Sequence, residues 1–223
     1  MGSTSCAWRI AEARFRDFRA YRFTIDAEEG REARANLDDV SAKSCGANSV
    51  DRSLYCGDDS TASVVFIVLA QDRRRVVHFN VTKNPTAVWA AQQIVEAFPE
   101  NTAPRYLVRD RDGVYGHHFI ARVEGLGVED IPISARSPWQ NCYAERVIGS
   151  IRRECLDHVV VINERHLRRI LKSYFQYYHR SRTHLALQKD APQRRPVHDR
   201  SWGRIVQIRE VGGLHHRYDR VAA

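Results

Sequence analysis

The sequence predicts a mixed α/β fold in which helices flank one sheet. Two β-rich runs, "SVVFIVLA" and "RRVVHFNVT", are separated by the polar "QDRR", a pattern typical of an antiparallel hairpin. Helical and strand patterns then alternate, and the whole order is β-β-α-β-α-β. With 223 residues, of which 43% are hydrophobic, the chain is long enough to bury the core of such a domain.

The elements after the hairpin are predicted from periodicity and capping residues. A helix is expected over "NPTAVWAAQQIVEAF", with Asn84 as its N-cap and Pro85 at its first position. Its face toward the sheet is expected to consist of Val88, Ala91, Val95 and Phe98. A strand in "RYLVRD", a short helix in "GHHFIARVEGLG" and a strand in "VEDIPIS" follow.

Two long helices are predicted next. The first lies in "SPWQNCYAERVIGSIRREC", begins at Ser137 and Pro138, and places Ile148, Ile151 and Cys155 on one stripe. The second lies in "NERHLRRILKSYFQYYHRSR" and has the clearest helical spacing of the chain, formed by Leu167, Ile170, Leu171, Tyr174, Phe175 and Tyr178. This spacing favours Tyr174 and Tyr178 as core residues over base-stacking ones. The last segment, "RIVQIREV", is consistent with a further strand.

The composition changes near residue 63. All 7 prolines and all 10 histidines lie after it, and residues 1–63 carry 9 Lys and Arg against 11 Asp and Glu. We therefore divide the chain into an atypical, loosely folded segment (residues 1–63), a core domain (residues 64–197) and a C-terminal tail (residues 198–223).

The charge favours an anionic partner. The formal net charge is +8, and it belongs to the part after residue 63. Nucleic acid is favoured over a membrane surface, because the longest apolar run, "VVFIVLA", is far too short to span a bilayer. The N-terminus does not resemble a secretory signal, so we expect a cytoplasmic protein. The five cysteines form no zinc-type spacing and are expected to be reduced thiols.

Acidic residues follow a predicted buried strand. "RYLVRDRDG" ends in Asp110 and Asp112, and such a strand end delivers carboxylates to a loop. Glu145 stands 35 residues after Asp110, on the first long helix. Taken alone, the glutamate is typical of a solvated helix residue and the aspartate pair is typical of turn chemistry.

Three motifs in order resemble the catalytic core of the DDE transposase and retroviral integrase superfamily, which includes insertion-sequence transposases. They are "RDRDGVYG", "ARSPWQNCYAERVIGSIRREC" and the closing segment "YFQYYHRSRTHLAL" followed by "AP". The resemblance implies a ribonuclease-H-like fold and metal-dependent cleavage and strand transfer of DNA. The resemblance is also compatible with a homo-oligomer of this chain on DNA.

The resemblance also implies roles for single residues. Asp110 matches the second metal-binding aspartate and Glu145 the third carboxylate, whereas Asp112 is expected to be a turn residue. Mg²⁺ or Mn²⁺ would be the cofactor, as a two-metal site. Arg152 matches a basic residue that meets DNA phosphate. The basic surface around it is expected to include Arg146, Arg153, Arg180 and Arg182.

The first aspartate of the family pattern is not matched clearly. Asp51 lies 13 residues before Val64, near the expected place, but Arg52 and Ser53 follow it instead of an apolar strand. The central first strand of the fold is therefore expected to be degraded. One interpretation is that residues 1–63 are translated out of the ancestral frame, which leaves a transposase remnant. The alternative to an active transposase is a non-catalytic DNA-binding protein, because residues 146–195 carry a net charge of +8 in either case.

Overall fold

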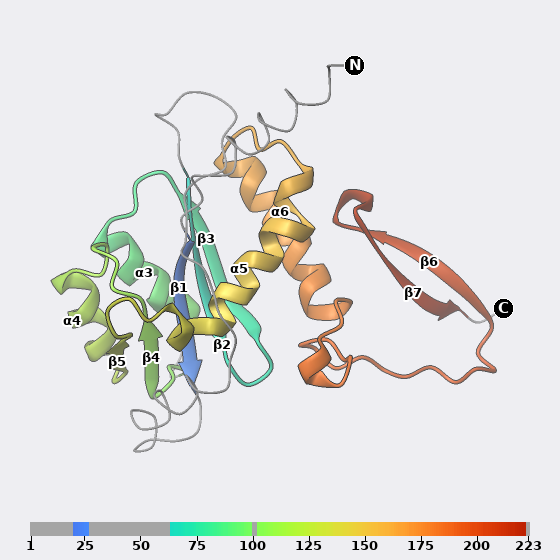
Figure 1. Cartoon of the computed structure of the whole chain (residues 1–223), viewed down its shortest axis with the longest axis horizontal. Coiled ribbons are helices and arrows are strands. Elements are labelled where there is room, and N and C mark those ends of the chain that lie inside the picture. Colours follow the sequence, from blue (N-terminus) through green and yellow to red (C-terminus); the bar gives the residue numbers. More distant parts are fainter. Residues whose placement is uncertain (1–19, 27–62, 100–101, 222–223) are drawn as a thin grey trace.

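The computed structural model describes residues 20–26, 63–99 and 102–221, and its architecture is mixed α/β (Figure 1). The main sheet has five strands in the order β3-β2-β1-β4-β5, and a separate two-stranded sheet pairs β6 with β7. The strands are β1 (Ala20–Asp26), β2 (Val64–Ala70), β3 (Arg75–Thr82), β4 (Tyr106–Arg109), β5 (Glu129–Pro132), β6 (Arg204–Glu210) and β7 (His215–Val221). The helices are α3 (Ala87–Ala97), α4 (His117–Gly125), α5 (Cys142–Glu154) and α6 (Glu164–Arg180). The predicted fold class is confirmed at this level.

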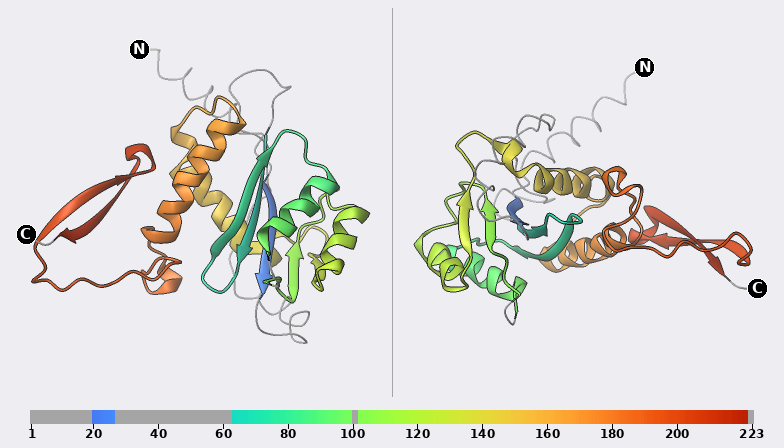
Figure 2. Two further views of the ribbon diagram at one scale, coloured as in Figure 1. Left: turned by 180° about the vertical axis from the view of Figure 1, so that it is seen from behind. Right: turned by 90° about the horizontal axis from the view of Figure 1, so that it is seen from below.

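Strand β2 has helices on both of its faces. Every residue from Val64 to Leu69 is buried, which explains the continuous apolar run. Val65 and Ile67 pack into the core that contains α5 and α6, whereas Phe66 and Val68 pack into the core that contains α3 and α4. The right-hand view of Figure 2 shows the sheet between these layers. The predicted hairpin of β2 and β3 is confirmed.

Strand β1 occupies the centre of the sheet, between β2 and β4. It runs parallel to β2 and antiparallel to β4, so that Ala20 pairs with Val65 and Phe23 with Arg109. Residues 20–26 therefore give β2 and β4 their backbone partners. The degraded first strand is predicted for the segment around Asp51, and that prediction stays untested. Asp51 lies outside the described residues.

Helix α3 covers one face of the sheet, and of its predicted face Ala91 and Phe98 are buried, Val95 is partly buried and Val88 is not. Its N-cap is Thr86, whose Oγ1 accepts a hydrogen bond of 3.1 Å from the amide of Trp89, so the helix begins after Asn84 and Pro85. Val88, predicted to be in the core, is 64% exposed. The buried residues are Ala90, Ala91, Gln93, Ile94 and Ala97. Ala90 and Ile94 belong to the core at this face, and Val88 does not.

Helices α5 and α6 form the core on the other face, and their predicted apolar stripes are confirmed. Ile148, Ile151 and Cys155 are buried on α5. On α6 the buried residues are Leu167, Leu171, Tyr174, Phe175 and Tyr178, and Ile170 is partly buried. Tyr174 and Tyr178 are therefore core residues. No helix in the described part of the chain is long and apolar enough to cross a membrane.

The C-terminal tail forms a hairpin of β6 and β7 beside α6 (Figures 1 and 2). Strand β6 is predicted by the sequence, and β7 is not. Val211, in the turn between them, is buried in the core formed with α5 and α6. The ring of His215 stacks on Tyr177 with a centroid distance of 4.2 Å and an interplanar angle of 3°. These contacts attach the hairpin to α6 near its turn.

Candidate functional site: two carboxylates and a basic helix

Asp110 directly follows β4, whose end is fixed by a buried ion pair. The Arg109 guanidinium donates two hydrogen bonds, of 2.8 and 2.7 Å, to the carboxylate of Asp130 on β5. These two side chains are only 8% and 10% exposed. Bidentate pairing of this kind holds both side chains in one orientation. The backbone that leads into Asp110 is therefore rigid.

The turn after Asp110 depends on Asp112. Its Oδ1 accepts a hydrogen bond of 3.1 Å from the amide of Val114, and its carbonyl accepts one of 3.2 Å from the amide of Tyr115. This is a local turn in which an aspartate side chain replaces a backbone acceptor. It agrees with the turn role predicted for Asp112.

Glu145 lies in the first turn of α5. Hydrogen bonds connect the segment before α5 with the end of β5, and the end of β5 with the loop that follows β4. Arg111 Nε donates a hydrogen bond of 2.7 Å to the carbonyl of Ile133. The next amide, of Ser134, donates a bond of 2.7 Å to Gln140 Oε1, in the short turn that precedes α5. The end of β5 thus connects the loop after Asp110 with the start of α5 (Figure 1). Both Asp110 and Glu145 are half-buried, and neither lacks an interaction partner.

Asp110 and Glu145 are the two described carboxylates that the sequence motifs predict as metal ligands. Mg²⁺ is commonly held by one or two carboxylates, with waters and phosphate oxygens completing its shell. A pair such as Asp110 and Glu145 fits that chemistry. Within the residues that the structure describes, no group of three His, Cys, Asp or Glu side chains is placed to hold a metal ion. A third carboxylate would have to come from a residue outside the described ranges. The predicted candidate, Asp51, is one of these residues.

The central strand contributes no carboxylate at the level of Asp110. Its acidic residue, Asp26, pairs with Tyr106 at the opposite end of β4. At the end near Asp110, Phe23 pairs with Arg109. In this register the first aspartate of the predicted set is not supplied by β1.

The predicted basic residues differ in their exposure. Arg146 and Arg153 on α5 and Arg180 at the end of α6 are exposed. The Arg153 guanidinium lies over Gly149, where an added Cβ would be 2.9 Å from its Nη1. Arg152 is half-buried and has an interaction partner. The described part of α5 therefore presents at least two cations to solvent.

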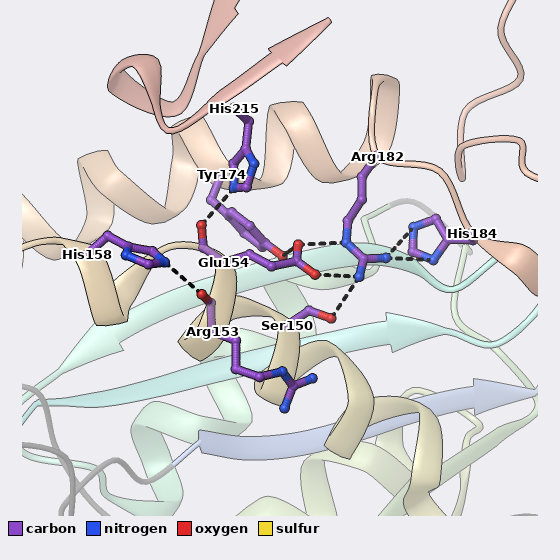
Figure 3. A network of polar contacts seen from close by, with 8 residues as sticks. All are labelled: Ser150, Arg153, Glu154, His158, Tyr174, Arg182, His184 and His215. Carbon is purple, nitrogen blue, oxygen red and sulfur yellow. Dashed lines mark hydrogen bonds and ion pairs between the residues drawn. The ribbon is translucent and has the colours of Figure 1, made fainter. Parts of the chain in front are cut away.

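Arg182 is used inside the domain instead. Its Nε and Nη2 donate hydrogen bonds of 2.7 and 2.5 Å to the carboxylate of Glu154 at the end of α5 (Figure 3). Tyr174 of α6 donates a further bond of 2.8 Å to the same carboxylate. Ser150 Oγ accepts a bond of 3.2 Å from Nη2. The side chain predicted to meet DNA is thus committed to an ion pair that joins α5 to the chain after α6.

The pKa values of this network follow from its geometry. Burial acts to raise the pKa of Glu154, but the hydrogen bonds from Arg182 and Tyr174 outweigh it and hold the pKa below its ordinary value. Burial lowers the pKa of His184 to about 4, and the neighbouring Arg182 acts in the same direction. His184 Nδ1 lies 3.2 Å from Arg182 Nη1, which is a donor, so the histidine accepts this bond as a neutral ring.

Two histidine side chains of the network form hydrogen bonds with backbone carbonyls. His215 Nε2 donates a hydrogen bond of 2.7 Å to the carbonyl of Glu154, and His158 Nε2 donates one of 2.9 Å to the carbonyl of Arg153 (Figure 3). They supply donors to carbonyls at the end of α5, where the helix leaves such groups unbonded. Sequence reasoning missed this role. The signal was a histidine-rich segment after a predicted strand, but its partner lies 61 positions earlier in the chain.

The comparisons with known proteins agree with the second and third motifs, which lie in the matched segment or overlap it. Residues 126–192 match the family model described as the integrase core domain. A search of curated proteins gives no match. Among solved structures, the chain resembles a chain of the simian T-cell lymphotropic virus intasome in complex with PP2A regulatory subunit B56 gamma, with a TM-score of 0.50 and 11% identity. The match covers 91% of this chain and 66% of that chain, and it concerns the fold alone. The resemblance predicted from the sequence motifs is confirmed.

Proposed function

We propose that this chain, whose residues 126–192 match the integrase core domain, is a DNA transposase or integrase protein of ribonuclease-H-like fold. The observation that supports the proposal most directly is the position of two acidic residues. Asp110 and Glu145 are 35 positions apart in sequence, and the connections through β5 link the segments that carry them. The reaction would be cleavage of a DNA strand followed by transfer of the freed 3′ end.

In this proposal the carboxylates of Asp110 and Glu145 hold divalent cations, Mg²⁺ or Mn²⁺. Such ions supply Lewis-acid stabilisation of charge on the attacking and leaving oxygens at phosphorus. The role of this chain is to hold the carboxylates rigidly, through the ion pair of Arg109 with Asp130 and through the core packing of α5. Exposed Arg146 and Arg153 would contact the DNA backbone, and Arg152 would lie on the face of α5 that carries Glu145.

A second candidate is a non-catalytic DNA-binding protein that derives from a transposase. The register of β1 favours it, because this strand places Asp26 beside Tyr106 instead of beside Asp110. Asp51 would then have to complete the metal site from outside the main sheet. If it does not, the basic surface would still bind phosphate.

Nicking of supercoiled plasmid by the purified chain, with Mg²⁺ or Mn²⁺, separates the two candidates. The catalytic proposal expects nicking that is lost in Asp110→Asn and Glu145→Gln. The matched control is Glu124→Gln, which removes an exposed carboxylate from α4 and should leave nicking unchanged. Loss in Asp51→Asn would assign the third ligand. Plasmid binding without any nicking by the unaltered chain would reject the catalytic proposal and support the second candidate.

A further inference from the structure

A basic cavity lies away from the two carboxylates, between the end of α6, the loop of residues 188–198 and strand β7. Its volume is about 580 Å³. Five cations and two acids line it: Arg180, Lys189, Arg194, Arg195 and Arg217, with Asp190 and Asp219. The lining therefore has an excess of positive charge, and this suggests an anionic ligand.

Both acidic side chains of the lining already have side-chain partners. Asp190 forms an ion pair of 2.7 Å with Arg73 and a longer one of 3.9 Å with Arg195. Asp219 lies 3.0 Å from His198 Nδ1. The contacts with Arg73 and Arg195 offset the negative charge of Asp190. Arg195 Nη2 also donates to the carbonyl of Lys189 at 3.4 Å.

Four cations of the lining are left for a ligand. Among the residues that the structure describes, Arg180, Lys189, Arg194 and Arg217 form no ion pair. Arg180, Lys189 and Arg194 are exposed. The Nε of Arg217 is buried and has no hydrogen-bond acceptor. A buried guanidinium donor without an acceptor is costly, and a phosphate oxygen in the cavity would satisfy it.

The loop that carries Lys189 and Arg194 is held in a fixed conformation. Arg73, in the turn between β2 and β3, donates hydrogen bonds of 2.9 Å to the carbonyl of Pro192 and 2.8 Å to that of Ala191. Gln188 and Lys189 both have left-handed backbone conformations, with φ of 57° and 65°. Such conformations are sparsely populated by residues other than glycine and persist where the surroundings impose them. The cations are thus displayed on a preorganised backbone.

We propose that this cavity binds successive phosphates of a DNA strand through Arg180, Lys189, Arg194 and Arg217. The choice of DNA as the source of phosphate rests on the proposed function. A free phosphate or pyrophosphate would be bound by the same cations. The four cations come from α6, the loop of residues 188–198 and β7, so that several phosphates of one strand can each meet a different cation. Tyr218 is 69% exposed at the same lining, where its ring can stack on a base or sugar.

The test measures binding of a fluorescent duplex as a function of salt, in the Asp110→Asn background so that cleavage does not interfere. The variant Lys189→Gln with Arg194→Gln removes two exposed cations and should not disturb packing. We expect binding about tenfold weaker at low salt, and a salt slope that is shallower by about two, since each lost phosphate contact removes about 0.9 from it. Arg217→Gln should weaken binding in the same direction.

The matched control is Arg122→Gln, which removes an exposed cation from α4 and should change affinity less than twofold. A cavity variant that equals this control would overturn the proposal. Titration of the unaltered chain with inorganic pyrophosphate identifies the other source of phosphate. If the unaltered chain binds pyrophosphate, and the cavity variant loses pyrophosphate binding but keeps its affinity for DNA, the assignment to DNA is wrong. Plasmid nicking is a separate readout, so its failure rejects the catalytic function without affecting this test.

Discussion

The ion pair between Glu154 and Arg182 should stabilise the fold far more than a surface pair does. It is bidentate, and the two side chains are 25% and 22% exposed. Loss of one partner from a fully buried pair costs about 3–5 kcal/mol, because the other charge is left unpaired. With the observed partial exposure, we expect Glu154→Gln to lower the free energy of unfolding by about 2–3 kcal/mol.

A double-mutant cycle isolates the interaction itself. Glu154→Gln, Arg182→Met and the double variant are unfolded with urea at pH 7, and the coupling energy is expected to be about 1.5–2.5 kcal/mol. The control cycle uses Glu164 and Arg168, a longer pair of 3.7 Å one helical turn apart on α6, whose side chains are 28% and 46% exposed. The bonds of Arg168 to Asn80 and Val81 are lost in both arms of this cycle and cancel. That pair should couple by only about 0.3–0.5 kcal/mol.

Acid should remove the coupling of Glu154 with Arg182. The pKa of Glu154 is lowered in the native state, so its contribution is fully present above the ordinary value of 4.5 and is lost as the pH falls through the native value. The cycle measured near pH 3 should therefore give a smaller coupling than the cycle at pH 7. A coupling at pH 7 no larger than that of the control pair would refute the reasoning.

Three further outcomes are expected. His179 Nε2 accepts a hydrogen bond of 3.0 Å from the amide of Val76, and burial lowers the pKa of this histidine to about 4. The neutral ring is required, so the free energy of unfolding should fall as the pH drops from about 6.5 to 4, by up to about 1 kcal/mol per pH unit, and His179→Asn should flatten this dependence in urea titrations. Ile151→Ala, at a fully buried position of α5, should cost about 2–5 kcal/mol by the same assay, and a cost below 1 kcal/mol would contradict its place in the core. Mn²⁺ at a hundredfold excess over its dissociation constant should stabilise the unaltered chain by about 2.7 kcal/mol in thermal unfolding, and an equal effect in Asp110→Asn would place the ion elsewhere.

The parts of the fold that sequence could predict are those with strong apolar periodicity. The hairpin of β2 and β3 is buried on both faces, and its two β-rich runs are separated by an obvious turn. The stripe of α6 from Leu167 to Tyr178 appears in the structure as predicted because one wide apolar face determines how such a helix packs. At the site, the sequence placed Asp110 at the end of a strand and Glu145 on a helix, and both positions are correct.

The missed elements had signals that were weak or non-local. Strand β1 does show alternation in "AYRFTID", but its polar half and its polar surroundings resemble a loop. Strand β7, "HHRYDRV", has few apolar residues and is a strand because β6 supplies its backbone partners. The pairing of Arg182 with Glu154 joins residues 28 positions apart, and only the packing of α5 against the chain after α6 brings them together. An arginine in a basic segment looks like a DNA contact until its acidic partner is known.

DNA affinity and strand cleavage should be separable in this protein, because they depend on different parts of it. In the proposed function, cleavage requires carboxylates around the end of β4, and the described residues place no third carboxylate there. In the proposed function, affinity depends on cations of α5, α6, the loop of residues 188–198 and β7. Arg73 holds this loop, and the pair of Glu154 with Arg182 holds the end of α5. Loss of the first aspartate would therefore abolish the chemistry without unfolding the basic surface. Such a chain would still occupy DNA ends and compete with an active enzyme for them. The purified chain, added to a nicking reaction of a catalytically active relative, should therefore inhibit that reaction.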